Sequence, residues 1–329
     1  MYDSLKIKDY TYSGKLGSHI SDFIVEKRAF GCLYNTEAKK LSEFSRMTLN
    51  YDFPDDTLTQ EVVEAWLKRR PTDADKTLYS RFGVIKGFAD YMVRHGYEAF
   101  VPLSSDLPKL HTQGYVPYVF THEEIQRFFD VYSEETNYHC AYDERFRVMM
   151  RMIFEILYCC GLRMSEATGL TSKDVDLQNG ILTVRFAKFE KSRYVPMSSD
   201  VIADLTSYMD SYIHEPFLFP GRTGNQLGHN SVYGEFRRVL LAAGIPHHGR
   251  GKGPRVHDFR HTFACHCLHR WIKNGVPVSS ALPRLSTYMG HNDMAATEKY
   301  LHMTAEVYPE ISEKLSLKYG HLIPKEVQS

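Results

Sequence analysis

Residues Pro254–His302 read PRVHDFRHTFACHCLHRWIKNGVPVSSALPRLSTYMGHNDMAATEKYLH and combine helical periodicity with an unusual set of polar side chains. The stretch begins with His257, Arg260 and His261 and ends close to Tyr300. Positions three apart share one face of a helix, so His257 and Arg260 are expected to point at one target. An arginine neutralises anionic oxygens, an imidazole transfers a proton, and a phenol is a nucleophile. The set is typical of chemistry on a phosphodiester.

The composition is that of an ordinary globular protein, with room in 329 residues for two domains and a large core. Apolar residues make up 43% and charged residues 24%, and the 40 basic and 40 acidic residues cancel. A net charge of zero gives no global indication of nucleic-acid binding, so any such indication must be local. One basic patch, opposed by Asp258 alone, comprises Arg237, Arg238, Arg250, Lys252, Arg255 and Arg260.

The cysteines do not have the spacing of a secreted disulfide framework, and we predict buried thiols in a reducing compartment. They are Cys32, Cys140, Cys159, Cys160, Cys265 and Cys267. A zinc site is disfavoured because no second ligand pair has zinc-finger spacing; its ligands would be His261, Cys265, Cys267 and His269. The N-terminus has no hydrophobic signal core, and no apolar run is long enough to span a membrane. We therefore predict a cytoplasmic protein without membrane contact, metal or other cofactor.

The hydrophobic pattern predicts a mainly α fold with a small β-hairpin or sheet (α+β), in two domains. Helical periodicity dominates the first domain, and its strongest stripe covers Thr77–His95, with Gly96 as a left-handed helix cap. A segment rich in proline and glycine then indicates an interdomain linker. The predicted parts are a poorly ordered polar segment (1–15), a helical bundle (16–102), the linker (103–118) and a second domain (119–329).

The second domain is predicted to begin with a helix capped by Thr121 and Glu124, which have capping-box spacing. A long buried helix follows and ends at Gly161. Arg163 then lies among apolar residues, where an unpaired guanidinium would be expensive. Glu166, three residues on, is its expected partner, and a plain helical ion pair is the alternative interpretation. Residues 180–197 alternate like a β-hairpin, and Lys188 at its turn would ordinarily be a solvated charge.

Four sequence boxes, in order, resemble those of the tyrosine recombinase (phage integrase) family. They are GLRMSEATGL (161–170), AKFEKSRYVPM (187–197), HDFRHTFA (257–264) and MGHNDMAATEKYLH (289–302). The resemblance covers about 119–302 and, less specifically, the helical N-terminal domain. It implies a core-binding, SAM-like bundle followed by a tyrosine recombinase catalytic domain. The catalytic residues it implies are Arg163, Lys188, His257, Arg260, His291 and Tyr300, with Glu166 orienting Arg163.

Two of these positions have rivals. Ala187 and Phe189 stand where the family usually has glycines, so Lys191 remains an alternative to Lys188. Tyr288 and Tyr308 are alternative phenols, although their sequence context does not match the closing box of the family.

The resemblance implies a site-specific DNA recombinase or integrase that cleaves and rejoins strands through a covalent 3′-phosphotyrosine. Arg163 and Arg260 would bind the phosphate oxygens, Tyr300 would attack phosphorus, and His257 would accept the phenol proton. The remaining implied roles are protonation of the leaving 5′ oxygen by Lys188 and a hydrogen bond from His291 to the phosphate. The sequence contains no carboxylate cluster suited to magnesium and no P-loop, so we predict activity without metal or ATP.

The implied partner is double-stranded DNA carrying specific recombination sites, bound by a homotetramer that is a monomer or dimer when free. Two alternatives stay open: a type IB topoisomerase-like nicking and closing enzyme, and a DNA-binding regulator without catalysis. The complete catalytic set argues against the second. The residues identify neither the target site, nor the mobile element or replicon served, nor any accessory protein. The tail either docks on a neighbouring protomer or packs on its own domain through Val307, Ile311, Leu315, Leu317 and Leu322.

Overall fold

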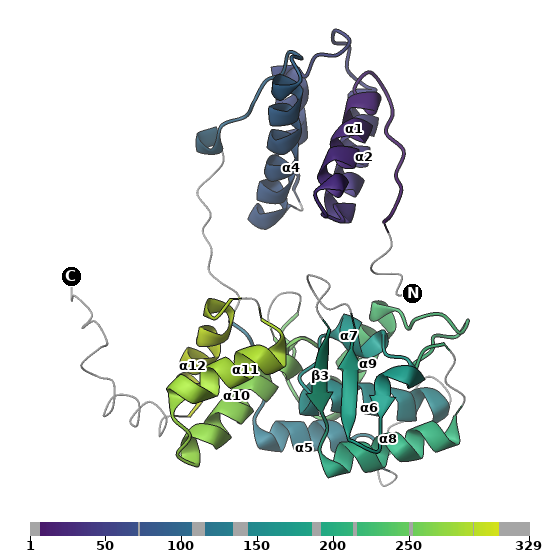
Figure 1. Ribbon diagram of the computed structural model, residues 1–329, viewed down its shortest axis with the longest axis vertical. Coiled ribbons are helices and arrows are strands. Elements are labelled where there is room, and N and C mark those ends of the chain that lie inside the picture. The colour runs from purple at the N-terminus through teal and green to yellow at the C-terminus, as the bar shows by residue number, and fades with distance from the viewer. Residues whose placement is uncertain are drawn as a thin grey trace, which may run out of the picture. The chain divides into compact units, whose positions relative to one another are not determined.

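The computed structural model divides the chain into two compact units, Met1–Gly114 and Tyr115–Ser329, which are described separately (Figure 1). The boundary between them falls within the segment predicted as a linker. The structure describes residues 7–71, 73–106, 116–133, 144–185, 192–212, 216–249, 253–291 and 293–308, excepting the side chains of 305 and 306.

The first unit is a helical bundle, as predicted. Its described helices are α1 (Gly17–Ala29), α2 (Asn35–Thr48), α3 (Gln60–Leu67), α4 (Asp75–Arg94) and a short 3₁₀ turn, Ser104–Asp106. The predicted apolar stripe lies on α4, where Phe82, Ile85 and Phe88 are buried. The chain leaves α4 through Gly96, whose φ of +83° is the predicted left-handed conformation.

The expectation that the N-terminal segment is poorly ordered is wrong for residues 7–15. Tyr10 and Tyr12 pack against the core of the bundle. The Ser13 backbone N–H donates to Ser45 Oγ at 3.2 Å, and Ser42 Oγ donates to the Thr11 carbonyl at 2.8 Å. These aromatic rings cover apolar surface that the helices leave open, which a reading for helical periodicity does not detect.

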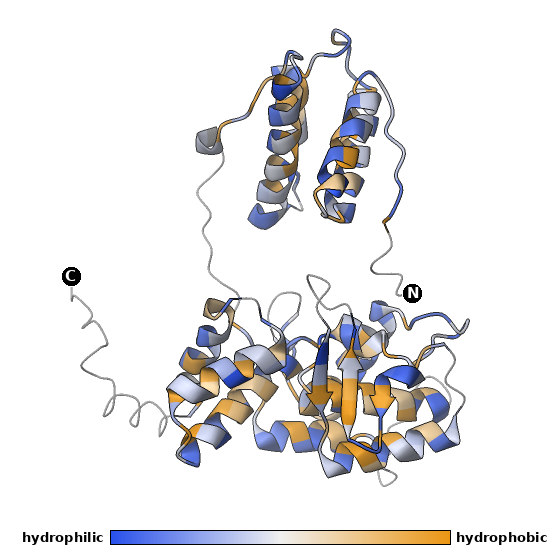
Figure 2. Ribbon diagram, viewed as in Figure 1, coloured by the Kyte–Doolittle hydropathy of each residue, from blue (hydrophilic) through white to orange (hydrophobic). Residues whose placement is uncertain are grey.

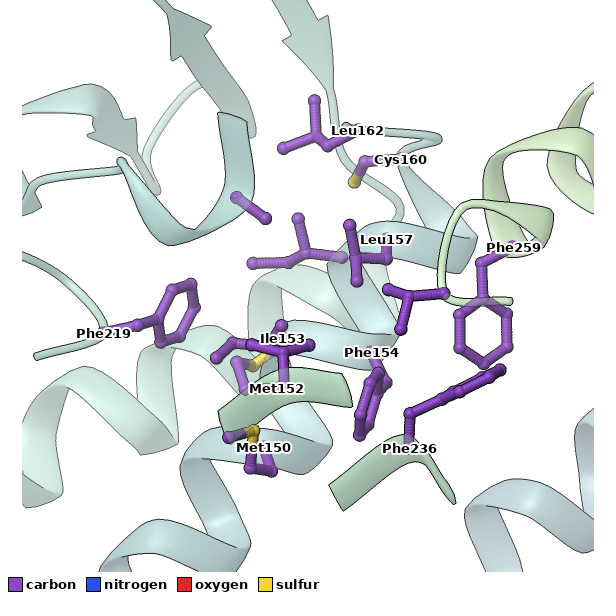
Figure 3. Close-up of a cluster of buried hydrophobic side chains, with 14 of the residues drawn as sticks. Met150, Met152, Ile153, Phe154, Leu157, Cys160, Leu162, Phe219, Phe236 and Phe259 are labelled. Carbon is purple, nitrogen blue, oxygen red and sulfur yellow. The ribbon is translucent and has the colours of Figure 1, made fainter. Parts of the chain in front are cut away.

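The second unit is built around one buried helix, α6 (Glu144–Cys159). Figure 3 shows its side chains Ile153, Phe154 and Leu157 in a cluster with Phe236 and Phe259, which come from helices later in the chain. Around α6 are α5 (His122–Asp130), α7 (Met164–Thr168), α8 (Ser199–Ser211) and α9 (His229–Ala242). The capping box predicted for the first helix is present: the Glu124 N–H donates to Thr121 Oγ1, and the Thr121 N–H donates to the Glu124 carboxylate.

Among the described residues the second unit also contains a three-stranded antiparallel sheet with strand order β1-β2-β3. The strands are β1 (Val175–Asp176), β2 (Ile181–Val184) and β3 (Arg193–Pro196), and β1 follows a 3₁₀ turn, Ser172–Asp174. Leu182 pairs with Val195 and Val184 with Arg193, which confirms the predicted hairpin pairing. Strand β1 was not predicted, because two residues show no period. The turn of the hairpin, with Lys188 and Lys191, lies outside the described residues.

Three helices complete the second unit: α10 (Asp258–Lys273), α11 (Val278–Met289) and α12 (Ala295–Val307). They pack on one another, and α10 also packs on α6 (Figure 1). In Figure 2 the strands and the helices both carry orange and blue residues, as expected for elements with one buried side. The predicted fold class is confirmed: a mainly helical chain with a small sheet. The tail beyond residue 308 lies outside the described residues.

The cysteine prediction holds only in part. Cys160, Cys265 and Cys267 are buried, but Cys32 and Cys159 are exposed, which corrects the expectation that all the thiols are buried. Cys140 lies outside the described residues. In the part of the chain that the structure describes, no helix has both the length and the apolar character to cross a membrane.

Candidate active site

The turn from α6 into α7 brings Arg163 and Glu166 together. Arg163 precedes the first residue of α7, so Glu166 lies in the first turn, where backbone N–H groups lack helical partners. Its carboxylate accepts the Arg163 backbone N–H at 2.9 Å and the Arg163 guanidinium at 2.7 Å. The pair predicted from the i, i+3 spacing is therefore present.

Glu166 also meets two further arginines that are distant in sequence. Arg193 on β3 donates to both carboxylate oxygens, at 3.0 and 2.8 Å, and Arg260 Nη1 lies 3.9 Å away. Burial would raise the pKa of Glu166, but the hydrogen bonds and charge of Arg193, with the Arg163 backbone N–H, outweigh it and lower the pKa to about 2. The carboxylate is therefore ionised and neutralises part of a dense cationic cluster.

Arg260 is buried at the start of α10 and connects three segments. Its Nη1 donates to the Gly161 carbonyl and its Nη2 to the Met289 carbonyl, both at 2.5 Å, and Nη2 lies 3.4 Å from His291 Nε2. Burial, reinforced by the charge of Arg163, lowers the pKa of Arg260 to about 10. The guanidinium remains charged at neutral pH, and each amino group keeps a second N–H beyond its carbonyl partner.

The burial of Arg260 corrects the predicted basic patch. Only 2% of Arg260 is exposed, so it belongs to the site and not to the surface. Arg238 forms an ion pair at 2.7 Å with Glu235, whose side chain is buried. Arg237 and Arg255 are exposed, while residues 250 and 252 lie outside the described residues. The surface patch is weaker than the sequence suggested.

Gly161, whose carbonyl accepts a hydrogen bond from Arg260, has a backbone conformation that favours glycine. Its φ is +60°, and an added Cβ would lie 2.4 Å from Phe263 Cδ1, whereas Gly244 has φ +65° with open space around it. We expect Gly161→Ala to lower the free energy of unfolding by about 1–2 kcal/mol for the backbone and about 1–3 kcal/mol more for the clash. Gly244→Ala should show the backbone effect alone. Urea unfolding of both variants measures the difference, and equal losses would contradict the packing argument.

The Tyr300 phenol lies inside the second unit, 1% exposed, in the cluster formed by α10, α11 and α12. Its hydroxyl is 3.1 Å from His261 Nδ1. The ring is nearly parallel to that of His291, with centroids 6.1 Å apart. Burial raises the pKa of Tyr300 to about 12, against the opposing charge of Arg260. The phenol is protonated at neutral pH and needs a proton acceptor before it can act as a nucleophile.

Two histidines, His261 and His291, lie beside this phenol, and the exposed His257 lies next to His261. Desolvation is the first cause of the lowered pKa of each. The pKa values are about 4 for His257, about 3 for His261 and about 4 for His291, with nearby cations adding to the effect of desolvation. All three imidazoles are therefore neutral at pH 7. His257 lies edge-on to His261, with ring centroids 4.8 Å apart. His291 Nδ1 lies 2.8 Å from Thr297 Oγ1.

His257 was the acceptor expected for the phenol proton, but the histidine in hydrogen-bond contact with Tyr300 is His261. His257 lies one ring further away, beside His261. The sequence placed His261 in the same helical turn without a role, since spacing alone does not tell which of two histidines four residues apart faces a residue on another helix.

Two further cations of the site were also missed. Arg193 and Lys299 lie inside two of the four sequence boxes, but the sequence assigns neither of them a role. The Lys299 ammonium lies 5.1 Å from the centroid of the Tyr300 ring, and its charge lowers the pKa of His257 and His261. One signal was available for Arg193: it precedes Val195 by two positions, so strand alternation puts both side chains on the same, inward face. Lys188 and its rival Lys191 lie outside the described residues.

The rival phenols have other surroundings. Tyr288 stacks on Phe263, with ring centroids 5.3 Å apart, and Tyr308 stacks on His269 at 3.8 Å. The two histidines of the disfavoured zinc site contact different phenols: His261 contacts Tyr300, and His269 contacts Tyr308. Within the described ranges, no group of three or more histidine, cysteine, aspartate or glutamate side chains could hold a metal ion.

The buried imidazole of His261 predicts that acid destabilises the second unit. The folded pKa of His261, about 3, lies below the ordinary value of 6.5. Below pH 6.5 the unfolded chain therefore binds a proton that the folded chain does not, and stability is lost as the pH falls towards the folded pKa. For His261 alone the slope approaches one proton, about 1.4 kcal/mol per pH unit. Glu155, whose pKa burial raises to about 7, acts in the opposite direction between pH 7 and 4.5.

Urea unfolding of wild type and His261→Asn at several pH values between about 7 and about 5 measures this effect. The wild-type free energy of unfolding should fall more steeply with acid than that of the variant, which has lost one of the titrating groups. Parallel pH dependences would show that the protonation of His261 is not linked to unfolding.

Comparisons with known proteins found relatives along most of the chain. A model of the phage integrase family matches residues 119–306. The putative integrase/recombinase y4rB of Sinorhizobium fredii is 30% identical over 312 residues, covering 91% of this chain and 96% of the relative. Tyrosine recombinase XerC of Xanthomonas campestris pv. campestris is 27% identical, covering 69% of this chain and 64% of the relative.

Solved structures share the fold. The XerH site-specific recombinase, bound to its difH substrate in a pre-cleavage complex, has a TM-score of 0.60 at 16% identity, covering 89% of this chain and 95% of that one. The Tn1549 transposon integrase, in complex with a circular intermediate DNA, has a TM-score of 0.59 at 19% identity, covering 86% and 94%. The family match spans the residues that form the site, and the S. fredii relative aligns along nearly the whole chain. The chain therefore belongs to the phage integrase family, the tyrosine recombinases.

Proposed function

We propose that this protein is a site-specific DNA recombinase that cleaves and rejoins strands through a 3′-phosphotyrosine formed on Tyr300. The observation that carries the proposal is the meeting, in one site, of the Tyr300 phenol with Arg260 and the Arg163–Glu166 pair. Attack on a phosphodiester is slow because the phosphate is anionic and the leaving alkoxide is poor. Fixed guanidiniums oppose the first difficulty by stabilising the charge that builds on the non-bridging oxygens.

In the proposed reaction the Tyr300 oxygen bonds to phosphorus while the bond from phosphorus to the 5′ oxygen breaks. The energy of the broken ester is kept in the phosphotyrosyl link, so a 5′ hydroxyl can later attack it and restore the DNA. Arg163 and Arg260 hold the phosphate, and His291, beside Arg260 Nη2, adds a hydrogen bond to it. Holding the reactants in line is itself a large part of such catalysis.

The phenol proton is proposed to leave through the histidines. Tyr300 has a pKa of about 12, so it does not ionise unaided at neutral pH. His261 is its hydrogen-bond partner, and we retain His257 as the final acceptor, next to His261. A bound phosphate brings negative charge to the site, which raises the pKa of these imidazoles and makes them better bases.

The leaving 5′ oxygen needs a proton, and Lys188 is the proposed general acid, with Lys191 as its rival. This assignment rests on the sequence resemblance alone. The phosphodiester chemistry proposed here uses only side chains, so cleavage is expected to persist in EDTA and without ATP.

DNA is the partner of this protein, in keeping with its family. We propose that the DNA carries specific recombination sites and that four protomers assemble on two of them, because exchange between two duplexes requires four strand cleavages. The free protein is then a monomer or dimer. A protein that acts on chromosomal or plasmid DNA in this way is proposed to work in the cytoplasm.

The proposal is tested by covalent capture. The full chain is incubated in EDTA with randomised duplexes that carry random nicks, and strands that stay attached to protein in denaturant are sequenced. A shared sequence defines the site, which is then synthesised with a nick just 3′ of the cleaved phosphate to trap the adduct. Bound DNA without any adduct would favour the non-catalytic regulator.

A second assay separates recombinase from topoisomerase. Two duplexes of different length that carry the captured site are mixed with wild-type protein. A recombinase yields hybrid duplexes, whereas a nicking and closing enzyme relaxes supercoiled plasmid but leaves the two duplexes unmixed.

A further inference from the structure

The guanidinium of Arg193 has no role in the reaction proposed above, and each of its three nitrogens donates a hydrogen bond within the protein. It begins strand β3, and only 11% of its side chain is exposed. Its Nη1 and Nη2 donate to the two oxygens of Glu166, and its Nε donates to the Tyr288 carbonyl at 3.0 Å. All three nitrogens thus have protein acceptors, and this geometry leaves little of the group for contact with DNA.

These contacts join three segments that meet at the site. Glu166 belongs to α7 and also binds Arg163, while Tyr288 lies at the end of α11, just before Gly290 and His291. Gly290 has a φ of +63°, and a Cβ placed on it would lie 3.2 Å from Arg193 Cδ. The chain therefore turns towards His291 at the point where the Arg193 side chain passes.

We propose that Arg193 is a positioning residue for strand cleavage: it fixes the Glu166 carboxylate, and through it the two arginines that hold the phosphate, relative to the hairpin and the His291 turn. This inference rests on the proposed function for its effect on rate. Without Arg193, Glu166 keeps Arg163 as a partner but loses two hydrogen bonds and the restraint on its orientation. The guanidiniums then hold the phosphate less well in line with Tyr300.

We expect an arginine to be required because the side chain binds two groups at once, the Glu166 carboxylate and the Tyr288 carbonyl. The planar fork matches the two carboxylate oxygens, while Nε points to a carbonyl on another helix. A lysine supplies the charge but not this geometry, so Arg193→Lys separates charge from orientation.

The matched control is Arg185, which lies at the other edge of the described hairpin, directly after β2. It binds Asp174, whose side chain is buried, and does not contact Glu166. Arg185→Gln removes an arginine–carboxylate pair from the hairpin base without touching the proposed positioning contact.

The experiment measures single-turnover formation of the covalent adduct on the captured, nicked site, together with DNA affinity. We expect Arg193→Gln to slow adduct formation about a hundredfold and Arg193→Lys at least about tenfold, with DNA affinity changed less than about threefold. Arg185→Gln should stay within about threefold of wild type. Guanidinium ion added to Arg193→Ala should restore part of the rate, and it should not accelerate wild type or Arg185→Gln. Full rates in Arg193→Gln and Arg193→Lys, or equal losses in Arg185→Gln, would overturn the proposal.

A double variant tests whether Arg193 acts through Glu166. If it does, Arg193→Gln combined with Glu166→Gln slows cleavage no more than the worse single variant; multiplied losses would contradict the coupling. A second readout is independent of activity. NMR titration of carbon-13-labelled glutamate follows the Glu166 carboxyl, whose pKa should rise in Arg193→Gln, and an unchanged titration would overturn the proposal. If wild type forms no adduct, the proposed function fails, and the titration still decides whether Arg193 controls Glu166.

Discussion

Tyr300→Phe is expected to reduce covalent capture of DNA to background while leaving DNA binding intact. The substitution removes only the hydroxyl, so the ring still fills its place among α10, α11 and α12. The lost hydrogen bond to His261 costs about 1 kcal/mol of stability, too little to unfold a domain. Loss of the adduct would therefore report the missing nucleophile. Gel separation of protein–DNA adducts in denaturant, beside a binding assay at fixed salt, makes the measurement.

The other two phenols of this region are the matched controls. Tyr288→Phe and Tyr308→Phe each remove a hydroxyl from a ring that stacks on another side chain, Phe263 or His269. Both variants should form the adduct at close to the wild-type rate. An adduct that persists in Tyr300→Phe and disappears in one of the controls would move the nucleophile to that residue.

Arg260→Met is expected to have the second largest effect, because it removes both a phosphate ligand and a structural donor. Loss of one preorganised charge stabiliser slows the chemical step by about 10²–10³-fold. The Gly161 and Met289 carbonyls also lose their donors, and each buried unsatisfied group costs about 1–3 kcal/mol. Adduct formation and urea unfolding measure the two losses on the same protein.

Arg163→Met separates the two effects. The Arg163 side chain is 25% exposed and pairs with Glu166, so its removal should slow cleavage to a similar degree but lower stability less than Arg260→Met. If both variants cleave normally, the guanidiniums are not the phosphate ligands. If Arg163→Met destabilises as much as Arg260→Met, the stability argument from the two carbonyls fails.

The helices of this protein were predictable because their signals are local. The capping box at Thr121 and Glu124 and the stripe of α4 repeat within one or two turns, and a helix joins residues three and four apart. The Arg163–Glu166 pair was predictable for the same reason. Strand β1 and the packing of Tyr10 and Tyr12 were not, since each depends on a partner elsewhere in the chain.

The sequence identified candidate catalytic residues, but it did not predict the contacts between them. Six catalytic residues were named from four boxes in order, and five of them lie in described parts of the second unit. Their roles relative to one another depend on contacts across the chain. The His261–Tyr300 hydrogen bond spans 39 positions and the Arg193–Glu166 contact spans 27. Spacing along one helix could not show which histidine meets the phenol, or that an arginine on a strand meets the carboxylate.

The sequence by itself determined the mainly helical class, the two-part order and the family, because periodicity, capping and linear motifs are written in consecutive residues. Only the tertiary structure decided that Tyr300 is buried against His261, that Arg260 bridges Gly161 and Met289, and that Arg193 holds Glu166. The physical reason is that burial and long-range hydrogen bonds exist only once α10, α11, α12 and the sheet have packed together. Those same contacts set the charge of each group at the site.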